Sequence, residues 1–318
     1  MKKNILGRTG IEVSAAGFGV LPMGPSQLAL PVDEGAQILR HALRRGINFI
    51  DTAQYYRTYP YISRALADGA FPDTVICSKS LCSDYDGMME AIHEACEALN
   101  RDTIDIFLMH EVRHGQLEER HGAWEALIAA RAGGLVRAIG LSTHHVDITE
   151  AAAQIPELDV VFPLINYAGL GIRRGNAFAS REDMMAAIAK CHDAGKGVFS
   201  MKAFGGGSLT AHYQEALDYV FSKPGIDSVM IGFGKISEVD DLFAYLDGSM
   251  PPDYNPDVSK KKVYINQEDC EGCGACRAAC PAGAIFYNEN GLAEVNHEKC
   301  LTCGYCSPVC PVRAVIMY

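Results

Sequence analysis

Two cysteine motifs near the end of the chain have residue types and spacing suited to iron–sulfur chemistry. The first, CEGCGACRAACP, runs from Cys270 to Pro281, and the second, CLTCGYCSPVCP, runs from Cys300 to Pro311. In each, cysteines stand at relative positions one, four, seven and eleven, followed by proline, which is the spacing with which short loops bind cubane clusters. The sequence therefore predicts two [4Fe-4S] clusters with the ligands Cys270, Cys273, Cys276, Cys280, Cys300, Cys303, Cys306 and Cys310.

Zinc is the alternative metal for these motifs. Zinc sites usually need two CxxC pairs or mixed cysteine and histidine ligands, whereas here three cysteines recur at equal intervals and the fourth precedes proline, twice. We therefore favour iron–sulfur clusters. The other four of the twelve cysteines are scattered through the earlier part of the chain, where we expect reduced, buried hydrophobic residues. They are Cys77, Cys82, Cys96 and Cys191.

Composition and charge limit the class of protein and its partners. With 318 residues, of which 48% are hydrophobic and 21% charged, the chain can form a globular fold with one large and one small domain. No run of eighteen apolar residues and no signal-peptide pattern is present, so we expect a cytoplasmic protein. The net charge of −11 argues against nucleic acid or an anionic membrane as a partner and favours a redox partner with a basic patch.

Short apolar runs alternate with amphipathic stretches from residue 30 to residue 248. Most of the runs are apolar on successive residues, which is typical of parallel strands buried on both faces. The stretches between them have apolar residues at helical spacing and often end in glycine or asparagine. Eight such units predict a (β/α)8 TIM barrel, with strands within residues 13–20, 47–52, 74–79, 104–110, 136–143, 159–166, 197–204 and 226–233.

A doubly wound Rossmann domain is the competing fold. It should have a glycine fingerprint directly after its first strand, and the glycines of residues 17–24 lack that spacing. The segment LGRTGIEVS before them predicts a hairpin, turning at Arg8 to Gly10, that closes the barrel floor. A proline-rich stretch after the last helix predicts a linker. We expect a barrel over 1–248, a linker over 249–259 and a small α+β iron–sulfur domain over 260–318.

Polar residues at three successive strand ends form the candidate catalytic site. Asp51 ends the second predicted strand and its loop carries Tyr55 and Tyr56, while Lys79 and His110 end the next two strands. In a TIM barrel, catalytic residues lie at the carboxyl ends of the strands. Taken singly, each could be a helix cap, a solvated residue or a satisfied core residue. Their occurrence on successive strand ends favours a shared catalytic role.

These residues also carry a resemblance to a known family. The run FIDTAQYY, with SK and IDIFLMH ending the next two strands, resembles the aldo-keto reductase family, and the resemblance covers nearly all of residues 3–247. It implies an NAD(P)-dependent oxidoreductase whose catalytic tetrad falls on Asp51, Tyr56, Lys79 and His110. Tyr56, rather than Tyr55, has the family's five-residue offset from the aspartate, so Tyr55 is assigned to packing.

The chemistry of such a tetrad is proton transfer to a substrate oxygen. A hydride that arrives at a carbonyl carbon leaves charge on oxygen, and a phenol with a pKa of about 10 is a weak donor at neutral pH. We expect the Lys79 ammonium to lower the pKa of Tyr56 and Asp51 to keep Lys79 charged. His110, as a neutral donor, would orient the carbonyl oxygen.

The resemblance also implies a nicotinamide dinucleotide, NADPH or NADH, across the barrel mouth. Ser142 and Thr143 match the region that holds the carboxamide, and Asn166 ends the sixth strand. Two glycine-rich segments present backbone amides ahead of helices, which suits phosphate groups. The predicted cofactor-binding residues are Ser142, Thr143, Asn166, Phe204, Gly205, Gly206, Gly232, Gly234 and Lys235.

Three departures from the family pattern concern this cofactor. Arg57 stands where the family usually has glycine, and Phe162 where a glutamine often holds the carboxamide. The last barrel helix lacks the arginine that usually meets the 2′-phosphate, which leaves Lys235 beside the repelling Asp240 and Asp241. The sequence therefore does not favour NADPH over NADH.

The C-terminal part resembles the bacterial two-cluster ferredoxin over residues 263–318. In that pattern the fourth cysteine of each motif serves the other cluster. The resemblance thus implies one cluster on Cys270, Cys273, Cys276 and Cys310, and another on Cys280, Cys300, Cys303 and Cys306.

Three functions remain open at this stage. Clusters move electrons singly whereas hydride chemistry moves two, so coupling them needs a flavin, for which no motif is visible, or a substrate that accepts single electrons. Our leading hypothesis is an oxidoreductase that reduces a small-molecule carbonyl or oxidises an alcohol, with clusters that exchange electrons with a ferredoxin-like or flavoprotein partner. The alternatives are a reductase whose clusters only cover the barrel mouth, and a non-catalytic, nucleotide-binding redox sensor or regulatory subunit.

Overall fold

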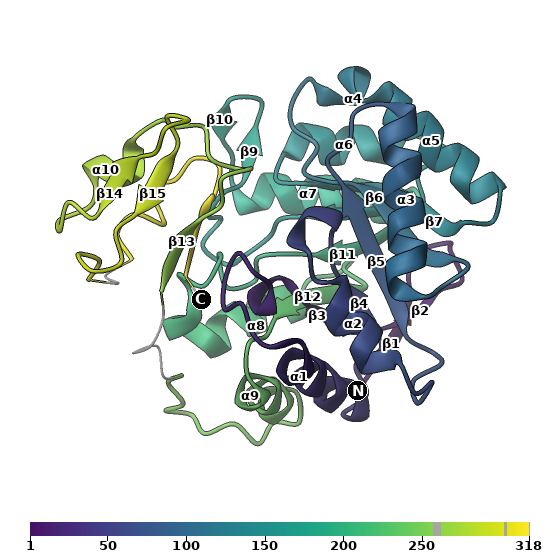
Figure 1. Ribbon diagram of the computed structural model, residues 1–318, viewed down its shortest axis with the longest axis horizontal. Coiled ribbons are helices and arrows are strands. Elements are labelled where there is room, and N and C mark those ends of the chain that lie inside the picture. The colour runs from purple at the N-terminus through teal and green to yellow at the C-terminus, as the bar shows by residue number, and fades with distance from the viewer. Residues whose placement is uncertain (257–261, 302–303, 318) are drawn as a thin grey trace.

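A computed structural model describes residues 1–256, 262–301 and 304–317. Eight parallel strands close into a barrel with helices around it, which confirms the predicted TIM barrel and excludes the Rossmann alternative (Figure 1). Each strand lies within or overlaps one predicted apolar run. The barrel strands are β3 (Ala16–Gly19), β4 (Phe49–Asp51), β5 (Val75–Ser80), β6 (Ile104–Met109), β7 (Val136–Thr143), β8 (Val160–Pro163), β11 (Gly197–Ser200) and β12 (Ser228–Gly232).

The strands are buried on both faces, as their continuous apolar runs require. Every residue of β4, β5 and β6 is buried, because one face packs in the barrel interior and the other packs under helices. Inside the barrel, the rings of Phe162 and Phe199 stack with centroids 4.3 Å apart, and Phe49 meets Phe199 edge-on at 5.0 Å. The barrel is therefore a packed core, and its polar residues are restricted to the two ends.

Amphipathic helices surround the barrel. Helix α3 ends at Asn100, which has the left-handed conformation that is common at helix ends. Asparagine tolerates this conformation, as the sequence pattern predicted. Among the described residues, no helix combines the length and apolarity needed to cross a membrane. The helices are α1 (Val32–Arg44), α2 (Tyr59–Leu66), α3 (Tyr85–Leu99), α4 (Gln116–Glu119), α5 (His121–Ala132), α6 (Val146–Gln154), α7 (Arg181–Asp193), α8 (Tyr213–Phe221) and α9 (Ile236–Leu246), with 3-10 turns η1 (Leu21–Met23), η2 (Gln54–Tyr56) and η3 (Thr210–His212).

The predicted N-terminal hairpin is present and closes one end of the barrel. Strands β1 (Lys3–Ile5) and β2 (Glu12–Ser14) pair antiparallel. Leu6, Ile11 and Val13 from this hairpin are buried in the same interior cluster as Phe49 and Phe199. The opposite end, where the strands terminate, is therefore the end left for a functional site.

The C-terminal part folds as a small α+β unit beside the barrel, drawn in yellow-green in Figure 1. Strand β13 (Val263–Ile265) pairs with β16 (Val315–Met317), and β14 (Ile285–Tyr287) pairs with β15 (Ala293–Val295). One short helix, α10 (Ala275–Ala278), lies within the first cysteine motif and contains Cys276. We call this unit the cluster domain. The predicted linker runs partly outside the described residues.

The end of the cluster domain packs directly on barrel loops. The amide of Met317 donates to the Gly206 carbonyl at 2.8 Å, and the Arg313 guanidinium donates to Ser208 Oγ at 3.0 Å. A Cβ at Gly171 would lie 1.9 Å from the Arg313 side chain, so that loop also approaches closely. We call residues 313–317 the C-terminal arm. The C-terminal arm lies on the loop that follows β11. This loop contains the glycine segment that was predicted to bind phosphate.

Gly207 lies so close to the C-terminal arm that a side chain there should destabilise the protein. Its φ is +88°, and a Cβ there would lie 1.9 Å from the Met317 carbonyl oxygen. Gly207→Ala should lower the free energy of unfolding of the cluster-loaded chain by about 2–4 kcal/mol, through backbone strain and overpacking. Gly134→Ala is the control, since its φ is +78° and nothing lies within 4 Å of the added Cβ. Equal losses in denaturant titrations of the two variants would contradict a tightly seated arm.

Candidate active site

A buried ion pair lies at the strand-end face of the barrel. Asp51 ends β4, Lys79 lies in the neighbouring β5, and the two strands pair in parallel. Lys79 Nζ donates to Asp51 Oδ1 at 2.6 Å and to the Thr52 carbonyl at 2.7 Å. Burial raises the pKa of the Asp51 carboxyl, while the Lys79 ammonium beside it acts in the opposite direction. The pair fixes the position of the loop that follows β4.

Tyr56 and His110 complete the predicted tetrad in space. Tyr56 lies in η2 directly after β4, and its hydroxyl is 3.3 Å from His110 Nε2. Lys79 Nζ lies 4.9 Å from the centroid of the Tyr56 ring. Burial lowers the pKa of His110 well below its usual value, so its imidazole is neutral, as the proposed orienting role requires. The structure thus brings the four predicted catalytic residues together.

The expected direction of the pKa shift at Tyr56 is wrong for this arrangement. Burial raises the pKa of Tyr56 well above 10, and Tyr55 and Asp51 raise it further. The Lys79 ammonium is already held by Asp51 and the Thr52 carbonyl. Tyr56 is therefore a neutral phenol that retains its proton, and a proton donor rather than a base.

Arg120 holds the backbone beside the tetrad in place. The sequence analysis did not predict this role. It precedes α5, is 5% exposed, and its guanidinium donates to the His110 carbonyl at 2.7 Å and the Ser80 carbonyl at 3.0 Å. These carbonyls follow β6 and end β5, so one side chain ties together the two strand ends that carry Lys79 and His110. The strand-end rule could not find it, because it lies between helices α4 and α5, away from any strand end.

A second acid–imidazole pair adjoins the tetrad and was also missed. Glu111, with φ +50°, has a carboxylate oxygen 3.1 Å from Nδ1 of His144. Burial raises the pKa of Glu111 to about 8 and lowers the pKa of His144 well below its usual value. Both groups are neutral near pH 7 as a result. The sequence signal was only that Glu111 follows His110.

The residues predicted to hold the carboxamide use their polar atoms within the protein. Ser142 Oγ accepts from the Glu111 amide at 2.8 Å, and Thr143 Oγ1 donates to the Val112 carbonyl at 2.6 Å. The carboxamide of Asn166 bonds to both the amide and the carbonyl of Leu170, at 2.9 and 3.0 Å. All three residues shape the loops around the barrel mouth.

The predicted phosphate loops are occupied as well. The C-terminal arm bonds to Gly206, and the Gly234 amide donates to Glu238 Oε2 at 2.7 Å, which puts a carboxylate at the second loop. Asp240, expected to repel phosphate, instead pairs with Arg45 and His41 of α1. The remaining predicted residues do not restore a site: Phe204 stacks on Tyr213, Gly205 packs against Leu209, and Gly232 and Lys235 are exposed. The Gly206 carbonyl bonded to the C-terminal arm and the Glu238 carboxylate at the Gly234 amide thus stand at the two loops where phosphate groups were predicted.

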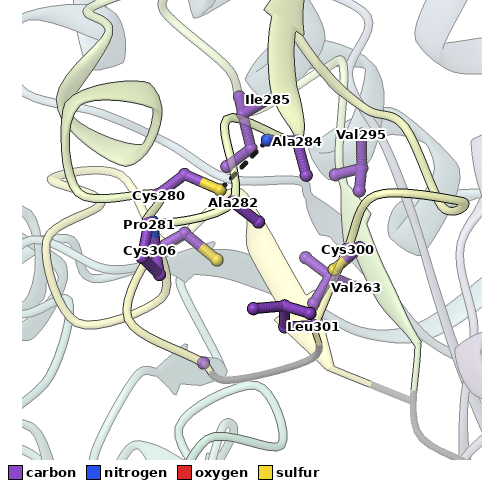
Figure 2. A pocket seen from close by; sticks show the side chains of 11 residues that line it. Val263, Cys280, Pro281, Ala282, Ala284, Ile285, Val295, Cys300, Leu301 and Cys306 are labelled. Carbon is purple, nitrogen blue, oxygen red and sulfur yellow. Dashed lines mark hydrogen bonds between the residues drawn. The ribbon is translucent and has the colours of Figure 1, made fainter.

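The cysteines of the cluster domain fall into two groups that match the implied pairing. Burial raises the pKa of Cys276 to about 11, and the nearby thiols of Cys310, Cys270 and Cys273 act on it in the same direction. Cys280, Cys300 and Cys306 instead line a separate, small pocket with apolar walls (Figure 2). Cys303 lies outside the described residues.

The surroundings of these sulfurs suit iron–sulfur clusters. Backbone amides donate to two sulfurs, from Ala293 to Cys270 at 3.4 Å and from Ala284 to Cys280 at 3.3 Å, and such bonds tune clusters. Thiolate donors with such amide contacts fit two clusters on the two groups of cysteines.

The four scattered cysteines only partly match the expectation. Cys77 and Cys191 are buried, whereas Cys82 and Cys96 are partly exposed at the edge of the core. Cys82 follows the end of β5 and Cys96 lies on α3, where each packs on the core with one side only. None of the four adjoins the cluster domain's cysteine groups in sequence.

Comparison with known proteins identifies the class to which this fold and site belong. Residues 17–218 match the Aldo/keto reductase family, and residues 263–317 match the 4Fe-4S dicluster domain. The chain therefore belongs to the aldo/keto reductase family and carries an additional dicluster domain at its C-terminal side.

Individual relatives are similar over one half to about four fifths of the chain. L-galactose dehydrogenase from Arabidopsis thaliana is 25% identical over 290 residues, which cover 75% of this chain and 86% of that protein. An aldo-keto reductase from Mycolicibacterium paratuberculosis is 28% identical over 50% of this chain, which spans 58% of that protein. The structure of a putative aldo-keto reductase from Pseudomonas aeruginosa superposes with a TM-score of 0.65, at 23% identity, over 78% of this chain and 95% of that one.

Breaking the buried ion pair should be costly. Lys79→Met keeps the side-chain length but leaves Asp51 without its counter-ion, and we expect a loss of about 3–5 kcal/mol in the free energy of unfolding. Lys3→Met, which breaks the exposed Lys3–Glu12 pair, should cost less than about 1 kcal/mol. Urea titrations of the two cluster-loaded variants measure their free energies of unfolding. Similar losses in both variants would contradict a buried, desolvated Lys79–Asp51 pair.

The raised pKa of Glu111 predicts a pH dependence of stability. Between about 4.5 and 8 the folded chain holds a proton that the unfolded chain releases, so stability falls as pH rises through this window. The slope is at most about 1.4 kcal/mol per pH unit. Glu111→Gln should flatten the decline measured by urea titration between pH 6 and 8, whereas exposed Glu125→Gln should keep it. Parallel slopes for all three proteins would contradict a buried, protonated Glu111.

Proposed function

We propose that this chain is an oxidoreductase that interconverts a carbonyl and an alcohol at Tyr56, with reducing equivalents exchanged through its cluster domain. The observation that carries the proposal is the grouping of Tyr56, His110 and the Lys79–Asp51 pair at the same barrel end on which the cluster domain packs. The oxidoreductase class follows from the family, and the particular substrate and electron path are our inference. The named activity of L-galactose dehydrogenase, a relative, is compatible with a hydroxyl substrate.

The proton chemistry belongs to the barrel residues. A carbonyl oxygen placed between Tyr56 Oη and His110 Nε2, now 3.3 Å apart, would accept a hydrogen bond from each. As charge grows on that oxygen, the neutral phenol of Tyr56 supplies its proton to it. His110 stays neutral and orients the oxygen.

The cluster domain defines how reducing equivalents are exchanged. When bound, [4Fe-4S] clusters supply or accept single electrons. A substrate suited to this chain is therefore a carbonyl that accepts electrons one at a time, such as a conjugated one, and the external electron partner is a one-electron carrier protein. Its reduction to the alcohol takes two electrons from the clusters and two protons, one from Tyr56 to the oxygen and one from solvent to the carbon. We assign no step to a nicotinamide, because the C-terminal arm bonds to the Gly206 loop and Glu238 accepts from the Gly234 amide, where phosphate groups were predicted.

The role of Tyr56 is tested by Tyr56→Phe. Loss of the hydroxyl removes the proton donor but keeps the ring, so turnover of a carbonyl panel with reduced methyl viologen should fall at least about a hundredfold. Tyr61→Phe removes a hydroxyl that donates to the Leu30 carbonyl and should retain full activity. Retained turnover in Tyr56→Phe would remove Tyr56 from this role.

A variant without clusters separates this function from its alternative, in which the cluster domain only covers the mouth. The observation that favours the alternative is the seating of the C-terminal arm on the Gly206 loop. Our proposal predicts that the paired variant Cys276→Ala and Cys306→Ala loses carbonyl turnover even where its circular dichroism shows a folded barrel. Activity with NADH or NADPH in that variant, independent of clusters, would support the alternative.

The affinity for NADH and NADPH also distinguishes the proposed function from its nucleotide-dependent alternative. With the arm on the Gly206 loop and Glu238 at the Gly234 amide, we expect the Kd for NADH and for NADPH to exceed about 1 mM, a binding free energy weaker than about −4 kcal/mol. Titration of the cluster-loaded chain, followed by nicotinamide fluorescence, measures it. Saturation at micromolar concentrations would contradict the occupied loops.

A further inference from the structure

One asparagine joins the cluster domain to the catalytic end of the barrel. Asn266 is 4% exposed, and its Nδ2 donates to the Tyr55 hydroxyl at 2.6 Å and to Asp269 Oδ2 at 2.7 Å. Its Oδ1 accepts from the Glu268 amide at 3.1 Å. Its main chain also bonds on both sides, since its carbonyl accepts from the Cys270 amide at 3.0 Å and its amide donates to the Ala314 carbonyl at 2.8 Å. The cysteine group of Cys270, Cys273, Cys276 and Cys310 comes from two chain segments. Asn266 bonds to both of them, at Cys270 and at Ala314.

Tyr55 continues this connection into the tetrad. Its ring meets the Tyr56 ring edge-on, with centroids 4.9 Å apart, and lies 5.5 Å from the imidazole of His110. Tyr55 was assigned to packing from the sequence, because a hydrogen bond to a residue 211 positions away leaves no local signal. In the structure it packs on both proton-handling residues and bonds to the loop before Cys270.

Further contacts hold the same cysteine loop to the barrel. Arg113, from the loop after β6, lies 3.5 Å from Glu271 and 3.9 Å from Asp269, the two neighbours of Cys270. The second cysteine loop has an equivalent asparagine, Asn296, whose carbonyl accepts from the Cys300 amide at 3.1 Å and whose Oδ1 accepts from the Glu298 amide at 3.0 Å. Over the described residues, the hydrogen bonds of Asn296 stay inside the cluster domain.

We propose that the cluster held by Cys270, Cys273, Cys276 and Cys310 is the one that faces the active site, and that the Asn266–Tyr55 hydrogen bond couples it to Tyr56 and His110. We call it the inner cluster, and the one held by Cys280, Cys300, Cys303 and Cys306 the outer cluster. Tyr55 and Asn266 are positioning residues, since they act through Tyr56 and through the Cys270 loop. The inference rests on the proposed function and extends it, because it places the inner cluster at the active site and the outer cluster toward the partner protein.

The surroundings of the outer cluster agree with this assignment. Leu301, which directly follows Cys300, and Tyr305, which directly precedes Cys306, are 71% and 62% exposed. Large exposed apolar side chains next to a cluster site are suited to contact with a partner protein. A one-electron carrier would therefore meet the outer cluster, while the inner cluster lies at the barrel.

The test is an anaerobic redox titration of the full chain, with both clusters reconstituted and followed by EPR. Hydrogen bonds near the ligating sulfurs set the potential of a cluster. Tyr55→Phe removes the acceptor of the Asn266 bond but keeps the ring, so it should shift the midpoint potential of the inner cluster alone. Cys276→Ser identifies the inner cluster by changing its g-values. Asn266→Ser should shift the same potential, and its matched control Asn296→Ser should shift only the outer one.

Two results would overturn the proposal: an unchanged inner potential in Tyr55→Phe, or a shift of the outer potential in its place. Tyr61→Phe, a phenol loss far from the domain contact, controls for general effects and should shift neither. Carbonyl turnover of the wild-type chain is measured on the same preparations. Turnover without a shift in Tyr55→Phe would leave the proposed function intact and refute the coupling, whereas a shift without wild-type turnover would do the reverse.

Discussion

The active site depends on one constraint, which is that a positive charge buried at the end of the barrel must be neutralised there. Lys79 is 1% exposed, and an ammonium in such a place is stable only with a counter-ion and hydrogen-bond acceptors close by. Asp51 and the Thr52 carbonyl provide both from the neighbouring strand and its loop. Because Tyr56 follows within the same loop, neutralising Lys79 also positions the phenol.

The second constraint is that two domains share the same barrel end. The loop before Cys270 bonds to Tyr55, and the C-terminal arm bonds to Gly206 and Ser208. This cover excludes water from the tetrad, which keeps Tyr56 and Glu111 protonated and His110 neutral. The same cover contacts the Gly206 loop, where a phosphate group was predicted. In the proposed function, this places proton transfer and electron exchange at one end of the barrel.

Much of this organisation could be predicted from the sequence. Continuous apolar runs located the barrel strands, because strands buried on both faces have no polar alternation. The strand-end rule found Asp51, Lys79 and His110, since their chemistry depends on local position in a known topology. Cysteine spacing predicted the dicluster domain, because a cluster imposes its geometry on a short segment.

The remainder depends on contacts between segments far apart in the chain. The bond from Asn266 to Tyr55 joins residues 211 positions apart, and the arm at Gly206 comes from the other end of the sequence. The pKa of Tyr56 was predicted in the wrong direction because its burial depends on this cover. Arg120 was missed because it reaches the strand ends from the junction between α4 and α5, where no strand-end pattern applies.

The most direct test of the account is a solvent deuterium isotope effect on cluster oxidation. Pre-reduced protein is mixed by stopped flow with menadione, a conjugated carbonyl that accepts electrons singly, and cluster absorbance is followed in H2O and D2O. If Tyr56 supplies the proton in the same step sequence that draws electrons from the clusters, wild-type oxidation slows in D2O and Tyr56→Phe loses that slowing. Equal rates in the two solvents, or an isotope effect that persists in Tyr56→Phe, would contradict the account.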